Sequence, residues 1–212
     1  MKNIFSLDKG MDFGKWNDKV SKTIYSESIG SLKRYDFSNQ RVADYGGGNG
    51  LLKKEIGGND WIVIDCDSSK SPDIVDNIVT HSGDYDVVVL RMVLHYLSDS
   101  EIEEMISRIQ KNGVKEIHLL QFWSERGEDL LIKKTISKLF EEPTEGKKFF
   151  RTKEEILSFF SEFSVEEVGF SRYVVSGEFY RNRFSNPTIP DVPHKETLTH
   201  FYINLVKKRK EK

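Results

Sequence analysis

The chain has 212 residues, with 32 lysines and arginines against 34 aspartates and glutamates, 37% hydrophobic residues and 12% aromatic residues. This composition excludes a wholly disordered chain, and the net charge of −2 excludes a globally basic nucleic-acid-binding surface. The single cysteine, Cys66, excludes an internal disulfide framework and a thiolate zinc cluster. No apolar run approaches the roughly 20 residues of a membrane helix, and the start lacks a signal-peptide core. We therefore expect a cytoplasmic protein with a single domain, residues 1–212.

Short β-rich apolar runs alternate with segments of helical spacing, which is typical of an α/β fold with a mostly parallel sheet. Residues 1–38 are polar with scattered aromatics, and we expect them to form a helical cap or lid. The expected strands are 41–45, 61–64, 74–75, 85–90, 117–122, 165–175 and 199–206. The expected helices are 51–56, the segment from Ser98 or Asp99 to Asn112, the segment 132–140, and one that starts at the Thr152/Glu155 capping-box pattern. Residues 186–193 contain three prolines and are expected to form a loop.

The glycine-rich segment 44–50 reads D-x-G-x-G-x-G and lies between an expected strand and an expected helix. Glycines allow positive φ and let a ligand approach the backbone closely, and the helix start offers free N–H groups. Asp65 ends the next strand, where a carboxylate can accept hydrogen bonds from both hydroxyls of a ribose. The alternative is a tight structural turn with a surface aspartate. A P-loop is excluded because no Gly-Lys-Ser/Thr follows, and position 51 is Leu where the dinucleotide fingerprint would require Gly.

With these residues the sequence resembles the class I S-adenosylmethionine-dependent methyltransferases, strongly over residues 40–125 and in element order over the whole chain. The resemblance implies a three-layer Rossmann-like fold with a mostly parallel seven-stranded sheet and one antiparallel strand near the C-terminus, for which 199–206 is the candidate. It implies S-adenosyl-L-methionine as the cofactor. Residues 39–125 would be the cofactor-binding half and 126–212 the substrate-side half.

The resemblance also assigns cofactor contacts. The glycine-rich turn would pack against the methionine part and the sugar, and the first acid after the second strand would bind the ribose, with the acid two residues later as its rival. The segment after the third strand would contact the adenine amino group, and the backbone at the end of the fourth strand would face the methionine end. The residues so assigned are Asp44, Gly46, Gly47, Gly48, Gly50, Asp65, Asp67, Asp76, Asn77, Ile78, Leu90 and Arg91.

Methyl transfer from a sulfonium requires mainly that nucleophile, methyl and sulfur are held in line, and a general base helps some acceptors. His95 follows the fourth expected strand, and segment 90–99 resembles the one that carries the catalytic histidine of small-molecule O-methyltransferases. His95 is therefore a candidate base or substrate contact, with a packing or hydrogen-bonding role as the alternative. Arg91 fits a contact to cofactor or substrate, or a salt-bridged strand end. The five histidines lack metal-ligand spacing, so no metal is expected.

Several further residues have two interpretations each. Phe122 and Trp123 would form a pocket wall or part of the core, and Trp16 and Tyr25 would cap the cofactor or pack in the core. Tyr180, Arg181 and Arg183 would contact the acceptor or lie in a solvated loop, and Asp84 and Asp86 would cap a turn or take part in catalysis. The basic tail 207–212 would contact RNA or form a solvated end.

We expect methyl transfer to a small molecule. The alternatives are a methyltransferase acting on tRNA or other RNA, and a non-catalytic S-adenosylmethionine-binding protein. The oligomeric state is left open.

Overall fold

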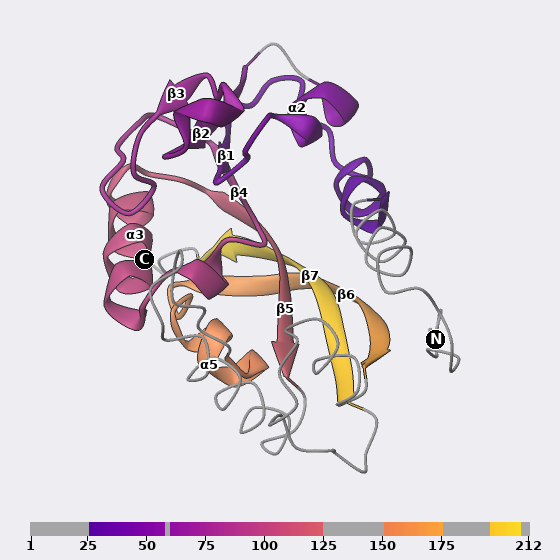
Figure 1. Cartoon of the computed structure of the whole chain (residues 1–212). Helices are drawn as coiled ribbons and strands as arrows, with labels where there is room; N and C mark the ends of the chain where they lie inside the picture. The colour runs from indigo at the N-terminus through magenta and orange to yellow at the C-terminus, as the bar shows by residue number, and fades with distance from the viewer. Residues whose placement is uncertain (1–25, 58–59, 125–150, 176–195, 209–212) are drawn as a thin grey trace.

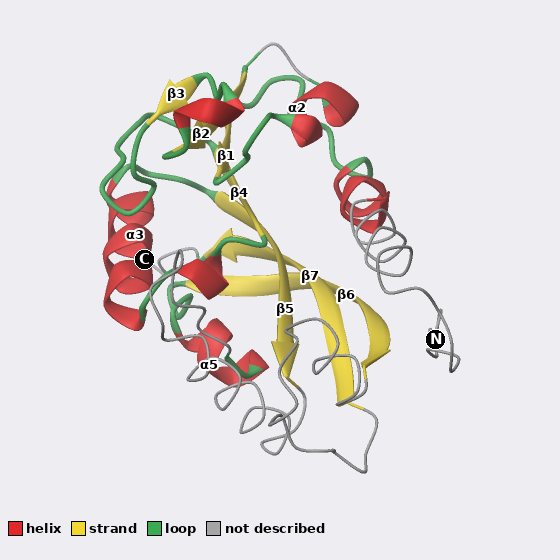
Figure 2. Cartoon of the chain, in the orientation of Figure 1, coloured by secondary structure: helices red, strands yellow, loops and turns green. Residues whose placement is uncertain are grey.

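A computed structural model describes residues 26–57, 60–124, 151–175 and 196–208 of the chain. Within these ranges seven strands form one sheet in the order β3-β2-β1-β4-β5-β7-β6 (Figure 1, Figure 2). The strands are β1 (Val42–Tyr45), β2 (Trp61–Asp65), β3 (Ile74–Val75), β4 (Val87–Arg91), β5 (Glu116–Ser124), β6 (Phe163–Val175) and β7 (Glu196–Lys207). Strands β1 to β5 pair in parallel, and β7 pairs antiparallel with both β5 and β6. The mostly parallel seven-stranded sheet with one antiparallel strand near the C-terminus is thus confirmed.

Helices cover both faces of this sheet, which gives three layers (Figure 1). One face packs against α3 (Asp99–Lys111) and α5 (Lys153–Ser158), and the other against α2 (Leu51–Ile56) and a helix at 26–32. Side chains alternate between the faces along each strand, as the pleat requires. In β4, for example, Val88 and Leu90 belong to the α3 side, whereas Val87 and Val89 belong to the opposite side. The four apolar residues of the strand, Val87 to Leu90, are all buried, as their continuous apolar sequence predicts.

The capping residues explain where the two helices on the α3 face begin. Ser98, and not Asp99, is the N-cap of α3: its hydroxyl accepts from Glu101 N–H, and the Glu101 carboxylate accepts from Ser98 N–H at 2.7 Å. Thr152 and Glu155 form the same reciprocal pair at the start of α5, as the sequence predicts. The helices therefore start where their sequences satisfy the free N–H groups of the first turn.

Strand β4 begins at Val87, two residues later than expected, and the two residues before it make side-chain contacts. The Asp86 carboxylate accepts from Arg41 N–H at 3.1 Å and pairs with Lys115 at 2.7 Å. The hydroxyl of Tyr85 lies 3.0 Å from His81 Nε2. Asp86 thus anchors the turn at the start of the strand, which agrees with the turn-capping interpretation.

Several predicted features lie outside the described residues: the helix 132–140, the proline-rich loop 186–193, most of the cap 1–38, and the side chains of Trp16, Tyr25, Tyr180, Arg181 and Arg183. The side chains of Phe122 and Trp123 are also not described. None of the helices in the described ranges combines the length and the hydropathy of a membrane-spanning segment.

Candidate functional site

The glycine-rich turn connects β1 to α2 and uses left-handed backbone. Gly48 has φ +57°, and a Cβ added there would meet no atom within 4 Å, so this backbone has an open side. Gly47 is close-packed instead: a Cβ there would lie 2.6 Å from Asp44 Oδ2. The turn is joined to the next strand by Gly46 N–H, which donates to Ile64 O at 2.8 Å. Open backbone at one glycine and tight packing at its neighbour are what a ligand cradle requires.

The structure places Asp65 and Asp67 in different surroundings. Asp65 Oδ2 accepts from Gly48 N–H and Oδ1 accepts from Asp67 N–H, both at 2.9 Å. Asp67 caps the short helix η1 (Ser68–Lys70), and its Oδ1 accepts from Ser69 N–H at 2.9 Å and Ser69 Oγ–H at 2.6 Å. These bonds hold the pKa of Asp67 below its ordinary value. Asp65 is therefore the acid that lies against the glycine-rich turn.

Asp44 is buried in β1, directly beneath that turn. Its side chain is 0% exposed, and neither carboxyl oxygen has a hydrogen-bond partner among the described residues. Burial raises its pKa to about 7, and the positive charge of Arg91 opposes this effect. A buried carboxyl without partners costs folding free energy, and such groups concentrate at functional sites.

The segment after β3 contains a buried histidine that the sequence analysis missed. Asp76 N–H donates to Asp65 O at 3.1 Å, which joins this segment to the end of β2. The Asp76 carboxylate accepts from His81 Nδ1–H at 2.7 Å, and His81 Nε2 accepts from the Tyr85 hydroxyl at 3.0 Å. The direction follows because an ionised carboxylate can only accept. Hydrogen bonding by His81 keeps the pKa of Asp76 below its ordinary value.

The other two residues predicted in this segment have structural partners as well. Asn77 Oδ1 accepts from Val79 N–H at 2.9 Å, and Ile78 lies in the core at 8% exposure. Asp76 Oδ1 accepts from Asn77 N–H at 2.7 Å. The segment is thus fixed beside Asp65 by its own hydrogen bonds.

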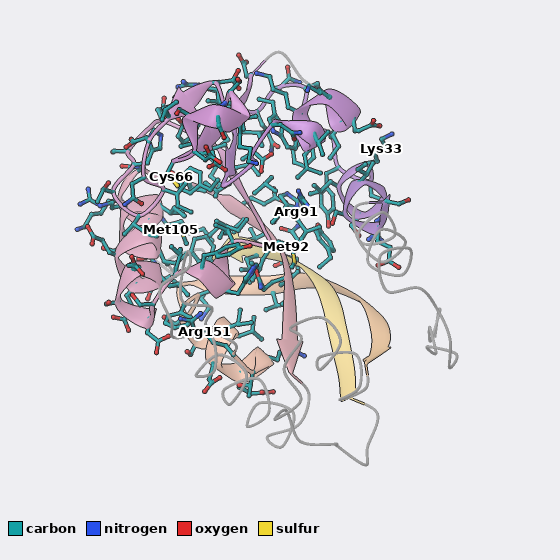
Figure 3. All side chains as sticks on the ribbon, viewed as in Figure 1. Lys33, Cys66, Arg91, Met92, Met105 and Arg151 are labelled. Atoms are coloured by element: carbon teal, nitrogen blue, oxygen red, sulfur yellow. The ribbon has the colours of Figure 1, made fainter. Side chains whose placement is uncertain are left out.

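The end of β4 carries the remaining predicted residues. Leu90 is buried and pairs in register with Tyr45 of β1 and Leu119 of β5. Arg91 is half-buried, and Met92 follows with φ +55°, its N–H donating to Leu120 O at 2.8 Å. Both residues lie near the middle of the molecule (Figure 3). Left-handed backbone at a non-glycine residue is strained, and such strain is frequent at functional sites.

His95 lies on η2 (Leu94–Tyr96), the short helix after β4. Its side chain is half-buried, and Nδ1 is 3.1 Å from Nε2 of Gln121 on β5. Gln121 is itself only 2% exposed. The sequence analysis did not single out Gln121, because no local pattern relates it to a residue 26 positions away.

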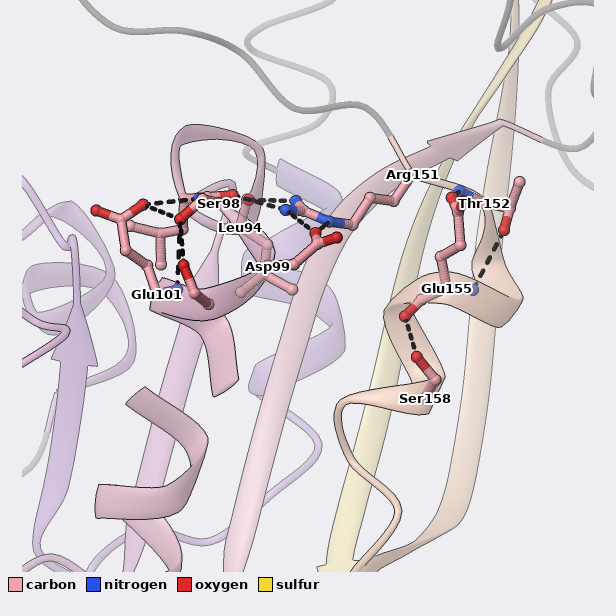
Figure 4. A network of polar contacts seen from close by, with 10 residues as sticks. Leu94, Ser98, Asp99, Glu101, Arg151, Thr152, Glu155 and Ser158 are labelled. Atoms are coloured by element: carbon pink, nitrogen blue, oxygen red, sulfur yellow. Dashed lines mark hydrogen bonds and ion pairs between the residues drawn. The ribbon is translucent and has the colours of Figure 1, made fainter. Parts of the chain in front are cut away.

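Arg151 holds the His95 segment from the opposite half of the sequence (Figure 4). Its guanidinium donates to Leu94 O at 2.9 Å and Leu97 O at 2.7 Å, at the two ends of η2. It also donates twice to Asp99 Oδ1, at 2.8 and 2.6 Å, while remaining only 7% exposed. The sequence analysis missed Arg151 because its partners are more than 50 residues away.

These elements meet at the carboxyl ends of the parallel strands. The glycine-rich turn follows β1, Asp65 ends β2, Asp76 follows β3, and Arg91 ends β4. Ligands of open α/β sheets bind at this edge. Among the residues that the structure describes, no three His, Cys, Asp or Glu side chains are grouped to hold a metal ion.

No protein-family model and no curated protein sequence matches the chain. Several solved structures match the chain. The magnesium protoporphyrin IX methyltransferase from Synechocystis PCC 6803 with bound SAH matches with a TM-score of 0.61 and 16% identity, over 95% of this chain and 90% of that one. A SAM-dependent methyltransferase from Methanosarcina mazei matches with a TM-score of 0.57 and 16% identity, over 83% and 96% of the two chains. The pyocyanin biosynthetic protein PhzM matches with a TM-score of 0.55 and 15% identity, over 94% and 63%.

The chain has the class I methyltransferase fold. Three described features agree with the resemblance found in the sequence: the sheet order, the single antiparallel strand of that sheet, and the turn after β1. Sequence identities of 16% or less establish the fold alone.

Proposed function

We propose that the protein is an S-adenosylmethionine-dependent methyltransferase. The observation that carries the proposal is the contact between the glycine-rich turn and Asp65, in which Gly48 N–H donates to Asp65 Oδ2 at 2.9 Å. This contact brings together open backbone and a carboxylate at the carboxyl edge of the sheet. The magnesium protoporphyrin IX methyltransferase structures with bound SAH and bound SAM have the same fold, which supports this cofactor for the present chain.

The residues at this edge fit the chemical groups of S-adenosylmethionine. Each Asp65 oxygen accepts one backbone N–H and retains a second lone pair, which suits it to ribose hydroxyls. Asp44 offers a buried carboxyl, unpartnered among the described residues, below the turn that would contact the methionine part. Asp76, Asn77 and Ile78 would line the adenine side. Leu90 and Arg91 would face the methionine end, where a guanidinium can pair with a carboxylate.

When bound, the cofactor supplies an activated methyl group on a positively charged sulfur. The protein's contribution is to hold the acceptor in line with that group and to exclude water, since positioning of this kind can supply about 7–11 kcal/mol of the barrier. His95 is the candidate side chain for the acceptor, because it follows the same strand as Arg91. We regard residues 39–125 as the cofactor-binding half and 126–212 as the substrate-side half of one domain.

A small-molecule acceptor is favoured over RNA. The near-neutral net charge supports this, as do the small-molecule names of the matched proteins, a porphyrin methyltransferase and a pyocyanin biosynthetic protein. The basic tail at 207–212 is the feature that favours RNA instead. Binding of RNA that weakens steeply with salt would support that alternative.

Calorimetric titration tests the cofactor directly. We expect binding of S-adenosylmethionine and S-adenosylhomocysteine in the micromolar range and no binding of NAD. Binding of NAD alone would contradict the proposal and favour an oxidoreductase. Binding of both sulfur ligands without methyl transfer to any acceptor tested would favour a non-catalytic binding protein.

A further inference from the structure

The position of His95 in the fold is fixed independently of any ligand. Arg151 binds the carbonyl oxygens of Leu94 and Leu97, which flank His95 on either side along η2. The same guanidinium binds Asp99 at the start of α3, so that η2 and α3 cannot move apart without breaking these bonds. Since the Arg151 side chain is only 6% exposed, water cannot easily replace its partners. His95 is therefore held on a rigid segment.

Nδ1 of the His95 imidazole lies against Gln121 of β5. Gln121 Nε2 lies 3.1 Å from His95 Nδ1. Gln121 Oε1 is buried and has no hydrogen-bond partner among the described residues. If the carboxamide were turned by half a rotation, its oxygen would face Nδ1 and its whole NH₂ group would take the unpartnered position. Buried N–H groups without partners are rarer than buried carbonyls without partners, which favours the orientation with nitrogen facing Nδ1.

This orientation determines the protonation of the ring. An amide N–H can only donate, so Nδ1 must accept and carries no proton; a neutral imidazole then carries its proton on Nε2. His81 has the opposite arrangement, because the carboxylate of Asp76 requires a proton on Nδ1. The two histidines thus present opposite tautomers in one molecule.

We propose that Gln121 is a positioning residue that holds His95 as its Nε2–H tautomer, so that His95 orients the methyl acceptor by donating a hydrogen bond and does not remove its proton. The role of His95 toward the acceptor rests on the proposed function, whereas its tautomer does not. The methyl carbon then bonds to a lone pair of an acceptor that has already lost its proton. The electron pair of the breaking carbon–sulfur bond stays on sulfur, so no base is needed in the transfer step.

Nitrogen-15 NMR of the histidine rings in the full-length protein tests the tautomer, both free and with S-adenosylhomocysteine. The resonances of His95 are assigned by their disappearance in His95→Asn. We expect a protonated Nε2 and an unprotonated, hydrogen-bonded Nδ1 for His95, and the reverse for His81 as the internal reference. A protonated Nδ1 on His95 in the wild-type protein at neutral pH would overturn the proposal.

Two variants at position 121 test whether Gln121 is responsible. Gln121→Glu replaces the donor by an acceptor, so we expect the proton to appear on Nδ1 of His95. Gln121→Met has a similar shape and no hydrogen bond, so the Nδ1 resonance should move to the position of an unbonded nitrogen while His81 stays unchanged. This second variant serves if the buried carboxylate of the first prevents folding. A His95 spectrum identical to wild type in either variant would overturn the role of Gln121.

The test is independent of the proposed function. If the protein failed to bind S-adenosylmethionine, the proposed methyltransferase function would be rejected, but the tautomer of His95 could still be measured. Conversely, cofactor binding with the wrong tautomer would leave the methyltransferase proposal intact and reject the role assigned to Gln121.

Discussion

Asp44 beneath the glycine-rich turn and Arg151 beside η2 are both buried ionisable side chains, yet their hydrogen bonding is opposite. Arg151 donates to two backbone carbonyls and to Asp99. Neither Asp44 oxygen has a hydrogen-bond partner among the described residues, and burial raises its pKa to about 7 against the opposing effects of Arg91 and Trp61. The comparison separates two uses of a buried polar group. One that is fully hydrogen-bonded fixes the backbone around it, whereas one without partners lowers stability and is retained where a ligand binds.

The largest expected effect is the pH dependence contributed by Asp44. Its pKa is raised in the folded state, so the folded protein keeps this proton where the unfolded chain has lost it. The stabilisation from proton binding is therefore lost as pH rises from about 4 to about 7, and a shift from 3.8 to about 7 corresponds to about 4 kcal/mol.

Asp44→Asn has no such titration and keeps the shape of the side chain. We expect the free energy of unfolding of the variant to rise relative to wild type between pH 4 and pH 8, measured by urea denaturation. The same variant should bind S-adenosylhomocysteine more weakly. A stability difference that stays constant across this pH range would contradict the burial argument.

Removal of the Arg151 guanidinium should have the next largest effect. Arg151→Met removes the donor to Leu97 O and leaves Leu94 O with only the Leu97 N–H at 3.3 Å, and we expect a loss of about 3 kcal/mol in unfolding free energy. Asp99→Asn is the matched control. Because the Asp99 side chain is 72% exposed, removal of its charge should lower the free energy of unfolding by less than about 1 kcal/mol. Equal losses in the two variants would show that the ion pair, and not the backbone contacts, carries the effect.

Asp65 and Asp67 form a matched pair for the cofactor site. Asp65→Ala should weaken S-adenosylhomocysteine binding by about 1–3 kcal/mol, because charged hydrogen bonds to the ribose would be lost. Asp67→Ala should leave this affinity unchanged, since that carboxylate caps η1. Calorimetry compares the two variants. A greater loss of affinity in Asp67→Ala would reverse the assignment of the ribose-binding acid.

The smallest expected effect belongs to the cap of α3. Ser98→Ala removes the hydroxyl that accepts from Glu101 N–H, and we expect a loss of about 1 kcal/mol in unfolding free energy. Cofactor affinity should remain at the wild-type value, because the cap lies outside the predicted cofactor contacts. A changed affinity would show that the segment held by Arg151 and the glycine-rich turn are energetically coupled.

Local sequence patterns determined most of the fold. The apolar run that ends at Leu90, the apolar spacing of α3 and the capping box of Thr152 and Glu155 each depend on neighbours a few residues away, and the structure agrees with all three. The glycine-rich turn and Asp65 could be paired from sequence for a similar reason, because consecutive parallel strands bring their carboxyl ends to one edge.

Only the tertiary structure decided which polar side chains meet across long stretches of chain. The contact of Gln121 with His95 joins β5 to the short helix η2, and that of Arg151 with Leu94 joins residues 57 positions apart. Neither contact has a periodic signature, since each depends on how separate elements pack and not on the spacing within one element. The different directions of Asp65 and Asp67 also come from the tertiary structure: one carboxylate faces the glycine-rich turn and the other its own short helix.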